Sequence, residues 1–204
     1  MRKSIAFVRH VVFGLAAFGV FGTNVAAAPI VEYTTTGTLT DSRLFTLGFE
    51  FSLSTSYDVT ALGYWDDGLG NDHQVGLWTS GGALLASTTV LGTDPITGHF
   101  RYHGIGTVTL GPGSYVLGGE FLGNNDPFPA DAQGLTSLPG YTWIGDRQLA
   151  GGLQFPTVFV GGYGDNGILA ANMLVVAAPE PATLFLLGTG LVGLAARRRR
   201  ETRS

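Results

Sequence analysis

Cysteine is absent from all 204 residues, and lysine occurs once, at Lys3. The lack of cysteine excludes disulfides, thiol nucleophiles and metal sites with thiolate ligands. Between Ala28 and Ala178, thirteen acidic side chains stand against three arginines, so this body has a formal charge of −10, whereas the whole chain has −4. Phosphate contacts need Lys and Arg, and the body therefore argues against nucleic acid or anionic lipid as a partner.

Signatures of several enzyme classes are also missing. The sequence contains no G-x-S-x-G nucleophile elbow, no P-loop, no dinucleotide-binding fingerprint and no H-E-x-x-H zinc motif. We therefore expect a protein that is not an enzyme. A secreted glycosidase stays open as an alternative, because it needs only two carboxylates, which any acidic chain offers.

The first 27 residues have the three parts of a secretory signal peptide. Arg2, Lys3 and Arg9 are positive, residues 11–22 are uncharged and mostly apolar, and small residues follow at 25–28. Cleavage after Ala27 is favoured, and the secretion machinery is the expected partner for export. The body that follows would be translocated.

An uncharged segment near the other end, residues 182–196, leads directly into four arginines. Its fifteen residues would extend about 22 Å as a helix, against a hydrocarbon core of about 30 Å. Arginine stays charged and clusters on the cytoplasmic side of a bilayer. The pattern predicts a short transmembrane helix that stops transfer and leaves its C-terminus in the cytoplasm.

A Pro-Glu-Pro element precedes this segment. The element, the glycine-containing apolar stretch and the arginine run together resemble the PEP-CTERM sorting signal of Gram-negative bacterial envelope proteins. The resemblance implies that an exosortase removes the tail, that the protein reaches the cell surface or the extracellular space, and that it is associated with exopolysaccharide and biofilm. The residues that carry the motif are Pro179, Glu180, Pro181, Arg197, Arg198, Arg199 and Arg200.

The body, residues 28–178, predicts an all-β fold. Glycine is frequent, and short segments alternate between apolar and polar residues with turn residues between them. About ten strands of this kind suggest an antiparallel β-sandwich, jelly-roll-like in class. The expected strands cover 45–53, 57–65, 73–78, 83–90, 99–103, 106–110, 114–121, 142–144, 154–160 and 168–176, with a long loop at 124–139.

Part of the body has a resemblance of its own. Residues 46–51, 61–66, 73–78 and 84–87 are similar to a β-sandwich domain of unknown function that recurs in secreted bacterial proteins. Some of those proteins carry the same sorting tail. The resemblance brings no active site with it.

Two groups of side chains are candidate sites. Asp66, Asp67 and Asp72 lie in a glycine-containing loop whose oxygens could bind calcium, although a solvated hairpin turn is the simpler explanation of the loop. Trp65 and the alternating cations of the expected strand 99–103 could contact sugar, or could form an ordinary polar strand face. These candidate sugar contacts are Trp65, His99, Arg101 and His103.

The sequence thus predicts a signal peptide (1–27), a β-sandwich domain (28–178) and a sorting tail (179–204). We expect a structural or adhesive protein of the exopolysaccharide matrix without a resident cofactor. It would span the inner membrane once, transiently, before release or attachment at the surface. The alternative from a different class is a carbohydrate-binding module, assisted by calcium.

Overall fold

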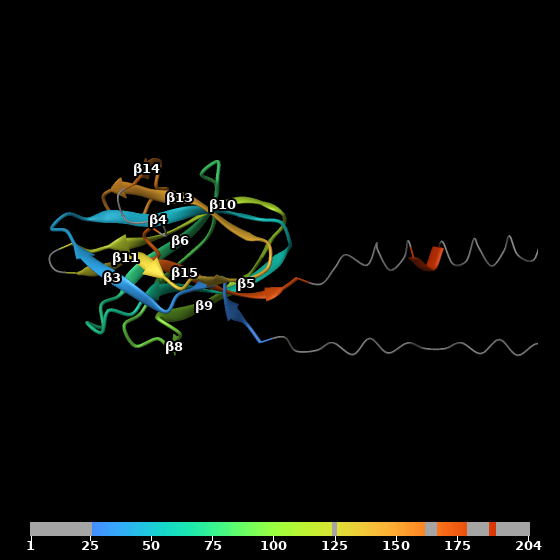
Figure 1. Ribbon diagram of the computed structural model, residues 1–204, viewed down its shortest axis with the longest axis horizontal. Helices are drawn as coiled ribbons and strands as arrows, with labels where there is room; N and C mark the ends of the chain where they lie inside the picture. Colours follow the sequence, from blue (N-terminus) through green and yellow to red (C-terminus); the bar gives the residue numbers. More distant parts are fainter. Residues whose placement is uncertain (1–25, 124–125, 162–166, 179–187, 191–204) are drawn as a thin grey trace, which may run out of the picture.

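The computed structural model describes residues 26–123, 126–161, 167–178 and 188–190 (Figure 1). Strands dominate this part of the chain, and its one helical stretch is the single turn at 188–190. No helix in these ranges is long and apolar enough to cross a membrane. The predicted signal peptide lies outside the described residues, as does the predicted transmembrane segment apart from that turn.

Two larger antiparallel sheets form the domain. The five-stranded sheet has the order β1 (Ala28–Pro29), β15 (Ala171–Ala177), β5 (Tyr57–Trp65), β9 (Phe100–Leu110) and β8 (Ile96–Thr97). The six-stranded sheet has the order β14 (Val158–Val160), β13 (Tyr141–Ala150), β4 (Phe45–Leu53), β10 (Gly113–Phe121), β6 (His73–Thr79) and β7 (Leu84–Val90).

Two small strand pairs complete the described fold. One joins β11 (Pro127–Gln133) to β3 (Thr35–Thr40), and the other joins β12 (Thr136–Ser137) to β2 (Val31–Glu32). All of these pairings are antiparallel, which confirms the predicted all-β, antiparallel class. The jelly-roll-like class is a finer assignment and stays a prediction.

One hydrophobic core joins the two larger sheets. It takes Phe49 and Leu117 from the six-stranded sheet and Leu62, Phe100 and Met173 from the five-stranded sheet, all fully buried. The period-2 alternation of the sequence supplies these inward side chains. The domain buries this core without any disulfide.

Strand β4 is buried on both faces. Thr46, on the face away from the core, has no exposed surface and hydrogen-bonds both the carbonyl of Gly152 and the N–H of Gln154. The segment that follows β13 therefore covers this face. The predicted strand 154–160 was too long, and only the three residues of β14 form a strand. Gln154 hydrogen-bonds to a side chain and not to the backbone of a neighbouring strand.

Two other predictions of local structure were wrong. The segments 99–103 and 106–110 form one continuous strand, β9, with an exposed Gly104 inside it. The expected loop 124–139 contains β11 and β12, because Phe128, Ala130 and Ala132 turn into the core while β11 pairs with β3. Proline in β11 obscured this strand in the sequence.

The two ends of the body lie side by side. Ala28 of β1 pairs with Val175 of β15, and Pro29 pairs with Leu174, in antiparallel register. Strand β1 therefore begins at the same end of the sheet at which β15 finishes. Figure 1 shows both ends of the described domain at this one end of the molecule.

Candidate functional site

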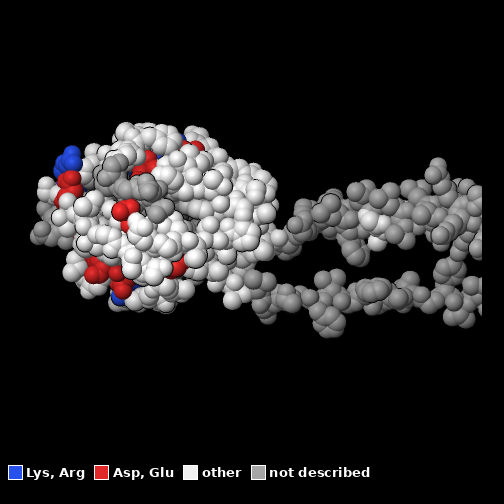
Figure 2. Space-filling model, in the orientation of Figure 1, with Lys and Arg blue, Asp and Glu red and all other residues white. Residues whose placement is uncertain are grey.

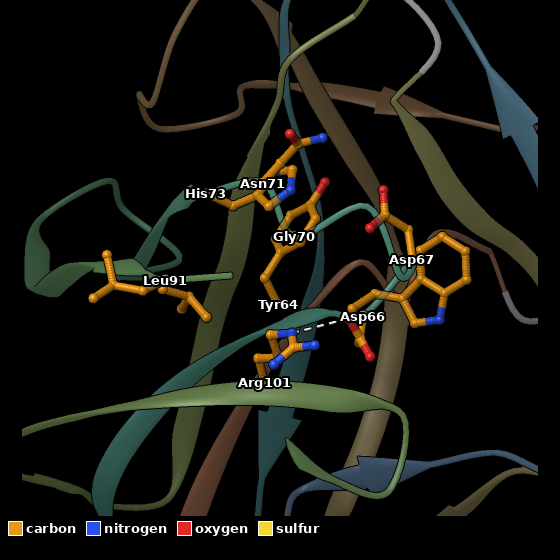
Figure 3. A pocket seen from close by; sticks show the side chains of 10 residues that line it. Tyr64, Asp66, Asp67, Gly70, Asn71, His73, Leu91 and Arg101 are labelled. Atoms are coloured by element: carbon orange, nitrogen blue, oxygen red, sulfur yellow. Dashed lines mark hydrogen bonds and ion pairs between the residues drawn. The ribbon is translucent and has the colours of Figure 1, made fainter. Parts of the chain in front are cut away.

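The acidic loop 66–72 and strand β9 meet at the end of β5 opposite the termini. A hollow of about 220 Å³, including space open to solvent, lies between them. Tyr64, Asp67, His73 and Arg101 are among the residues that line it, and Figure 3 shows their side chains around it. Gly68 and Gly70 adopt positive φ, which lets the loop curl over the hollow.

The cations predicted on β9 do share one strand face, and each has an acidic partner. Arg101 Nε donates to Asp66 Oδ1 at 2.9 Å, which is the dashed line in Figure 3. His103 Nδ1 lies 2.9 Å from Asp94 Oδ2. The neighbouring residues Phe100 and Tyr102 are buried, as the alternation predicted.

His99 completes this row of charge pairs just before β9 begins. Its Nδ1 lies 2.6 Å from Glu32 Oε1, and its ring stacks on Tyr33 with centroids 4.6 Å apart. The predicted sugar-contact stripe is thus a ladder of three acid–base pairs. Each pair joins β9 or its start to a different segment, so the ladder fastens the loops around this end of the domain.

The three candidate calcium ligands do not point to one place. Asp66 pairs with Arg101, Asp67 Oδ1 accepts the N–H of Leu69 at 2.7 Å, and Asp72 Oδ1 accepts the N–H of Gly92 at 2.8 Å. Within the described residues, no group of three or more His, Asp or Glu side chains is arranged to hold a metal ion. Calcium binding by these aspartates remains an untested prediction.

Trp65 also lines the hollow, at the last residue of β5. Its side chain is half-buried and packs against the core, so only part of the ring could reach a ligand. The sugar-contact prediction places this ring beside Asp66 and Arg101, and the structure brings these three residues together.

A buried polar cluster lies beneath the hollow, and sequence reasoning missed it. It consists of Tyr64, Asp67, His73 and Asp126. Three of its oxygens are buried without a hydrogen-bond partner among the described residues: Tyr64 Oη, Asp67 Oδ2 and Asp126 Oδ1. Burial raises the pKa of Tyr64 well above its ordinary value, and the charges of Asp126 and Asp67 add to this effect.

The imidazole of His73 organises this cluster. Its Nδ1 lies 2.9 Å from the carbonyl oxygen of Glu120, and since a carbonyl only accepts, Nδ1 carries a proton. Nε2 faces Asp126 Oδ1 at 3.9 Å. Burial raises the pKa of Asp126, although the N–H of Leu122 and the charge of His73 oppose the change. No local motif marks Asp126, because it lies 53 positions from His73 in the printed sequence.

The polar side chains around the hollow contact one another or the backbone. The cations around the hollow are neutralised by neighbouring acids, and the buried cluster is enclosed by the ring of Tyr64 and the backbone of β10. The polar side chains of this end thus hold loops 66–72 and 91–95 against β9. The described side chains can therefore tether these two loops to the strand.

The sorting-motif residues Pro179 to Pro181 and Arg197 to Arg200 lie outside the described residues. The strand in front of them, β15, is hydrogen-bonded to β5 on one side and to β1 on the other. The N–H of Ala178 still donates to the carbonyl of Ser56 at 3.2 Å. A single residue therefore separates the end of β15 from Pro179.

Comparison with known proteins identifies this tail. No curated protein and no solved structure matches the chain. Residues 177–200 match the family described as the PEP-CTERM protein-sorting motif. That motif implies export, processing by an exosortase and membrane-anchored sorting to the cell surface. The chain thus carries, one residue behind its last strand, the sorting signal of PEP-CTERM exosortase substrates.

Proposed function

We propose that this chain is a non-enzymatic, exported envelope protein whose β-domain is held at the inner membrane by its own tail. Residues 182–196 cross the bilayer and Arg197 to Arg200 stay in the cytoplasm. An exosortase then removes the tail, and the domain is released or attached at the surface, where it serves a structural or adhesive role in an exopolysaccharide matrix.

The observation that carries this proposal is the pairing of β1 with β15. It places residue 28, where the signal peptide would be cut, beside Val175 and only a few residues from the sorting motif. Two membrane segments that leave a folded domain at the same end can both enter one bilayer. This geometry suits a chain whose two ends are on the cytoplasmic side and whose body is translocated.

The non-enzymatic role is supported by the charge pairs of β9. Arg101 lines the hollow, and Arg101, His99 and His103 are each matched to a carboxylate of the same domain. A side chain that binds an anion needs a charge that neighbouring acids do not already neutralise. Here the charges are used to hold the fold.

Mass spectrometry of the exported protein tests the sorting step. In a host with an exosortase, the mature form is expected to begin at Ala28 and to lack Arg197 to Arg200. Glu180→Gln removes the charge of the Pro-Glu-Pro element and is expected to leave the tail uncut. Glu201→Gln, beyond the arginine run, is the matched control. A wild-type mature protein that retains the arginines contradicts the proposal.

A carbohydrate-binding module is the second candidate, favoured by the half-buried Trp65 at the hollow. Glycan-array binding with and without a calcium chelator separates the two. Binding that Trp65→Ala abolishes supports the module, and chelator sensitivity adds the calcium role of Asp66, Asp67 and Asp72. No binding under either condition leaves the structural role.

A further inference from the structure

The end of the domain from which the chain leaves is built of three loops, two of them bonded to each other and the third placed beside them by the pairing of Leu110 with Tyr57 and of Gly113 with Leu53. We call it the exit pole: loops 54–56, 111–112 and 138–140, together with Ala178. The N–H of Ser54 donates to the carbonyl of Gly140 at 2.9 Å, and the hydroxyl of Tyr57 donates to the carbonyl of Pro139 at 2.8 Å. The exit pole is therefore a continuous surface of the fold.

The printed sequence allows little distance between this surface and the apolar tail segment. Four peptide steps separate Ala178 from Ala182. Fully extended, they reach about 14 Å. The headgroup layer on one side of a bilayer takes up about 5–7 Å of this. A tail inserted from residue 182 thus holds the exit pole within about 7–9 Å of the headgroups.

Charge is distributed unevenly between the two ends of the domain. The loops of the exit pole consist of Ser54, Thr55, Ser56, Gly111, Pro112, Leu138, Pro139 and Gly140, none of them charged. The nearest acid on the body is Asp58, whose carboxylate accepts the hydroxyl of Thr109. Figure 2 shows no charged side chain on the visible surface at this end, and the acids and arginines gather toward the other.

The opposite end, which we call the far pole, carries six of the thirteen acidic side chains of the body. Its loops precede β4, follow β5, follow β7 and precede β11, and its acids are Asp41, Asp66, Asp67, Asp72, Asp94 and Asp126. Strand β5 has nine residues and separates the poles by about 27 Å. This is more than three times the Debye length of about 8 Å at physiological ionic strength. An anionic surface at the exit pole would barely sense the far-pole carboxylates.

We propose that the exit pole is a membrane-apposed surface, which rests on the phospholipid headgroups of the outer leaflet while the tail is inserted. The body as a whole is strongly acidic and would be repelled by anionic lipid. Because the loops of the exit pole carry no carboxylate, that repulsion is weakest in the one orientation that turns this pole toward the bilayer. The bilayer therefore orients the domain with the exit pole toward the headgroups and the acidic hollow away from them. This inference rests on the proposed insertion of residues 182–196.

Fluorescence quenching by lipid headgroups tests the orientation, and the cysteine-free chain makes single labels simple. Full-length Thr55→Cys (exit pole) and Ser42→Cys (far pole) are reconstituted into vesicles of phosphatidylcholine and phosphatidylglycerol that carry a headgroup quencher. A membrane-impermeant maleimide dye labels the outward-facing domains. We expect the label at 55 to be quenched several-fold more than the label at 42. Equal quenching, or stronger quenching at 42, overturns the inference.

A charge test uses matched variants of the same net charge. Ser54→Glu in the Thr55→Cys chain adds a carboxylate at the exit pole, and Leu69→Glu adds one in the exposed far-pole loop 66–72. One charge near an anionic leaflet shifts the apposed population about five-fold. Quenching at 55 is expected to fall for Ser54→Glu and to recover at high salt. Insensitivity to both changes, or equal loss from both, contradicts a lipid contact.

A third label separates this inference from the proposed function. Thr202→Cys, in spheroplasts of a host without exosortase, is expected to react with the impermeant reagent only after permeabilisation. Reaction in intact spheroplasts would refute insertion of the tail, and with it the proposed function. A protected residue 202 together with an unquenched label at 55 refutes the membrane-apposed surface alone.

Discussion

The imidazole of His73 stacks on the ring of Tyr64, with centroids 3.8 Å apart and planes 9° from parallel. His73 is the first residue of β6, and Tyr64 is the last but one of β5. The stack therefore joins a strand of the six-stranded sheet to one of the five-stranded sheet. The Cδ2 and Cε2 atoms of the Tyr64 ring also lie against Gly119 of β10. This one contact thus locks the end of the sandwich that carries the acidic hollow.

Tyr64→Phe is expected to leave the domain equally stable or up to about 1 kcal/mol more stable. Its hydroxyl is buried without a partner among the described residues, so removing it relieves a desolvation cost and loses no bond. Tyr57→Phe is the matched control, because it deletes the bond to Pro139 and should cost about 1 kcal/mol. Urea unfolding monitored by tryptophan fluorescence measures both. A larger loss for Tyr64→Phe would reveal an unseen partner of this hydroxyl.

Gly119→Ala is expected to destabilise the domain by about 1–3 kcal/mol. A Cβ at this position would lie 2.5 Å from the Tyr64 ring, which is fully buried and stacked on His73 and so has little freedom to move. Gly104→Ala in β9 meets nothing within 4 Å and should change stability by less than about 1 kcal/mol. Thermal unfolding of the two variants compares them directly. Equal effects would argue against the clamp.

Asp146 gives the domain a specific pH dependence. Burial raises the pKa of its carboxyl from 3.8 to about 6, against the opposing bond from the N–H of Ile168. The native state therefore binds this proton more tightly than the unfolded state. Between pH 4 and pH 6 this group lowers the free energy of unfolding as pH rises, by about 3 kcal/mol at most.

Asp146→Asn should abolish that contribution, since the amide oxygen can still accept the Ile168 N–H and carries no charge. The variant is expected to match the wild type near pH 4 and to exceed its stability above pH 6. Urea titrations from pH 4 to pH 7 give the difference between the two proteins, in which the other acids cancel. A constant difference across this range would show that Asp146 titrates normally.

Glu50 and Arg147 form a buried ion pair across β4 and β13. Arg147 Nε donates to Glu50 Oε2 at 2.9 Å, and its guanidinium lies 4.0 Å from the centroid of the Phe159 ring. Both side chains are about 10% exposed. Glu50→Gln is expected to cost about 3–5 kcal/mol because it leaves a buried guanidinium without its counterion.

The double variant Glu50→Leu/Arg147→Met should cost less than Glu50→Gln, because it removes both charges from the interior. A double-mutant cycle with the single changes Glu50→Leu and Arg147→Met, followed by urea unfolding, measures the coupling. Additive costs would show that the pair contributes no interaction energy of its own.

Sequence patterns were a good guide where one local rule decided the outcome. The strands at 45–53, 57–65 and 73–78 follow the alternation of their own residues, and the buried Phe100 and Tyr102 follow it too. Strand β11 escaped prediction because prolines within it normally argue against a strand. It is held by pairing with β3, nearly ninety residues away, which no local window reveals.

The candidate site also depends on contacts between residues that are distant in the sequence, which local patterns do not predict. Asp66, Asp67 and Asp72 share a loop in sequence, yet their carboxylates turn to three different partners. The cluster of Tyr64, His73 and Asp126 could not be foreseen, since its members come from β5, β6 and the loop before β11. Their proximity depends on how two sheets stack.

The sequence by itself determined the all-β class, the acidity of the body and the sorting motif at 177–200, because each depends on residue types and their local order. Only the tertiary structure decided that β1 and β15 lie together, that each cation of β9 meets an acid, and that charge gathers at the pole away from the exits. Those relationships join residues distant in the chain. They are fixed by strand register and sheet packing, which arise from the whole fold and not from any one segment.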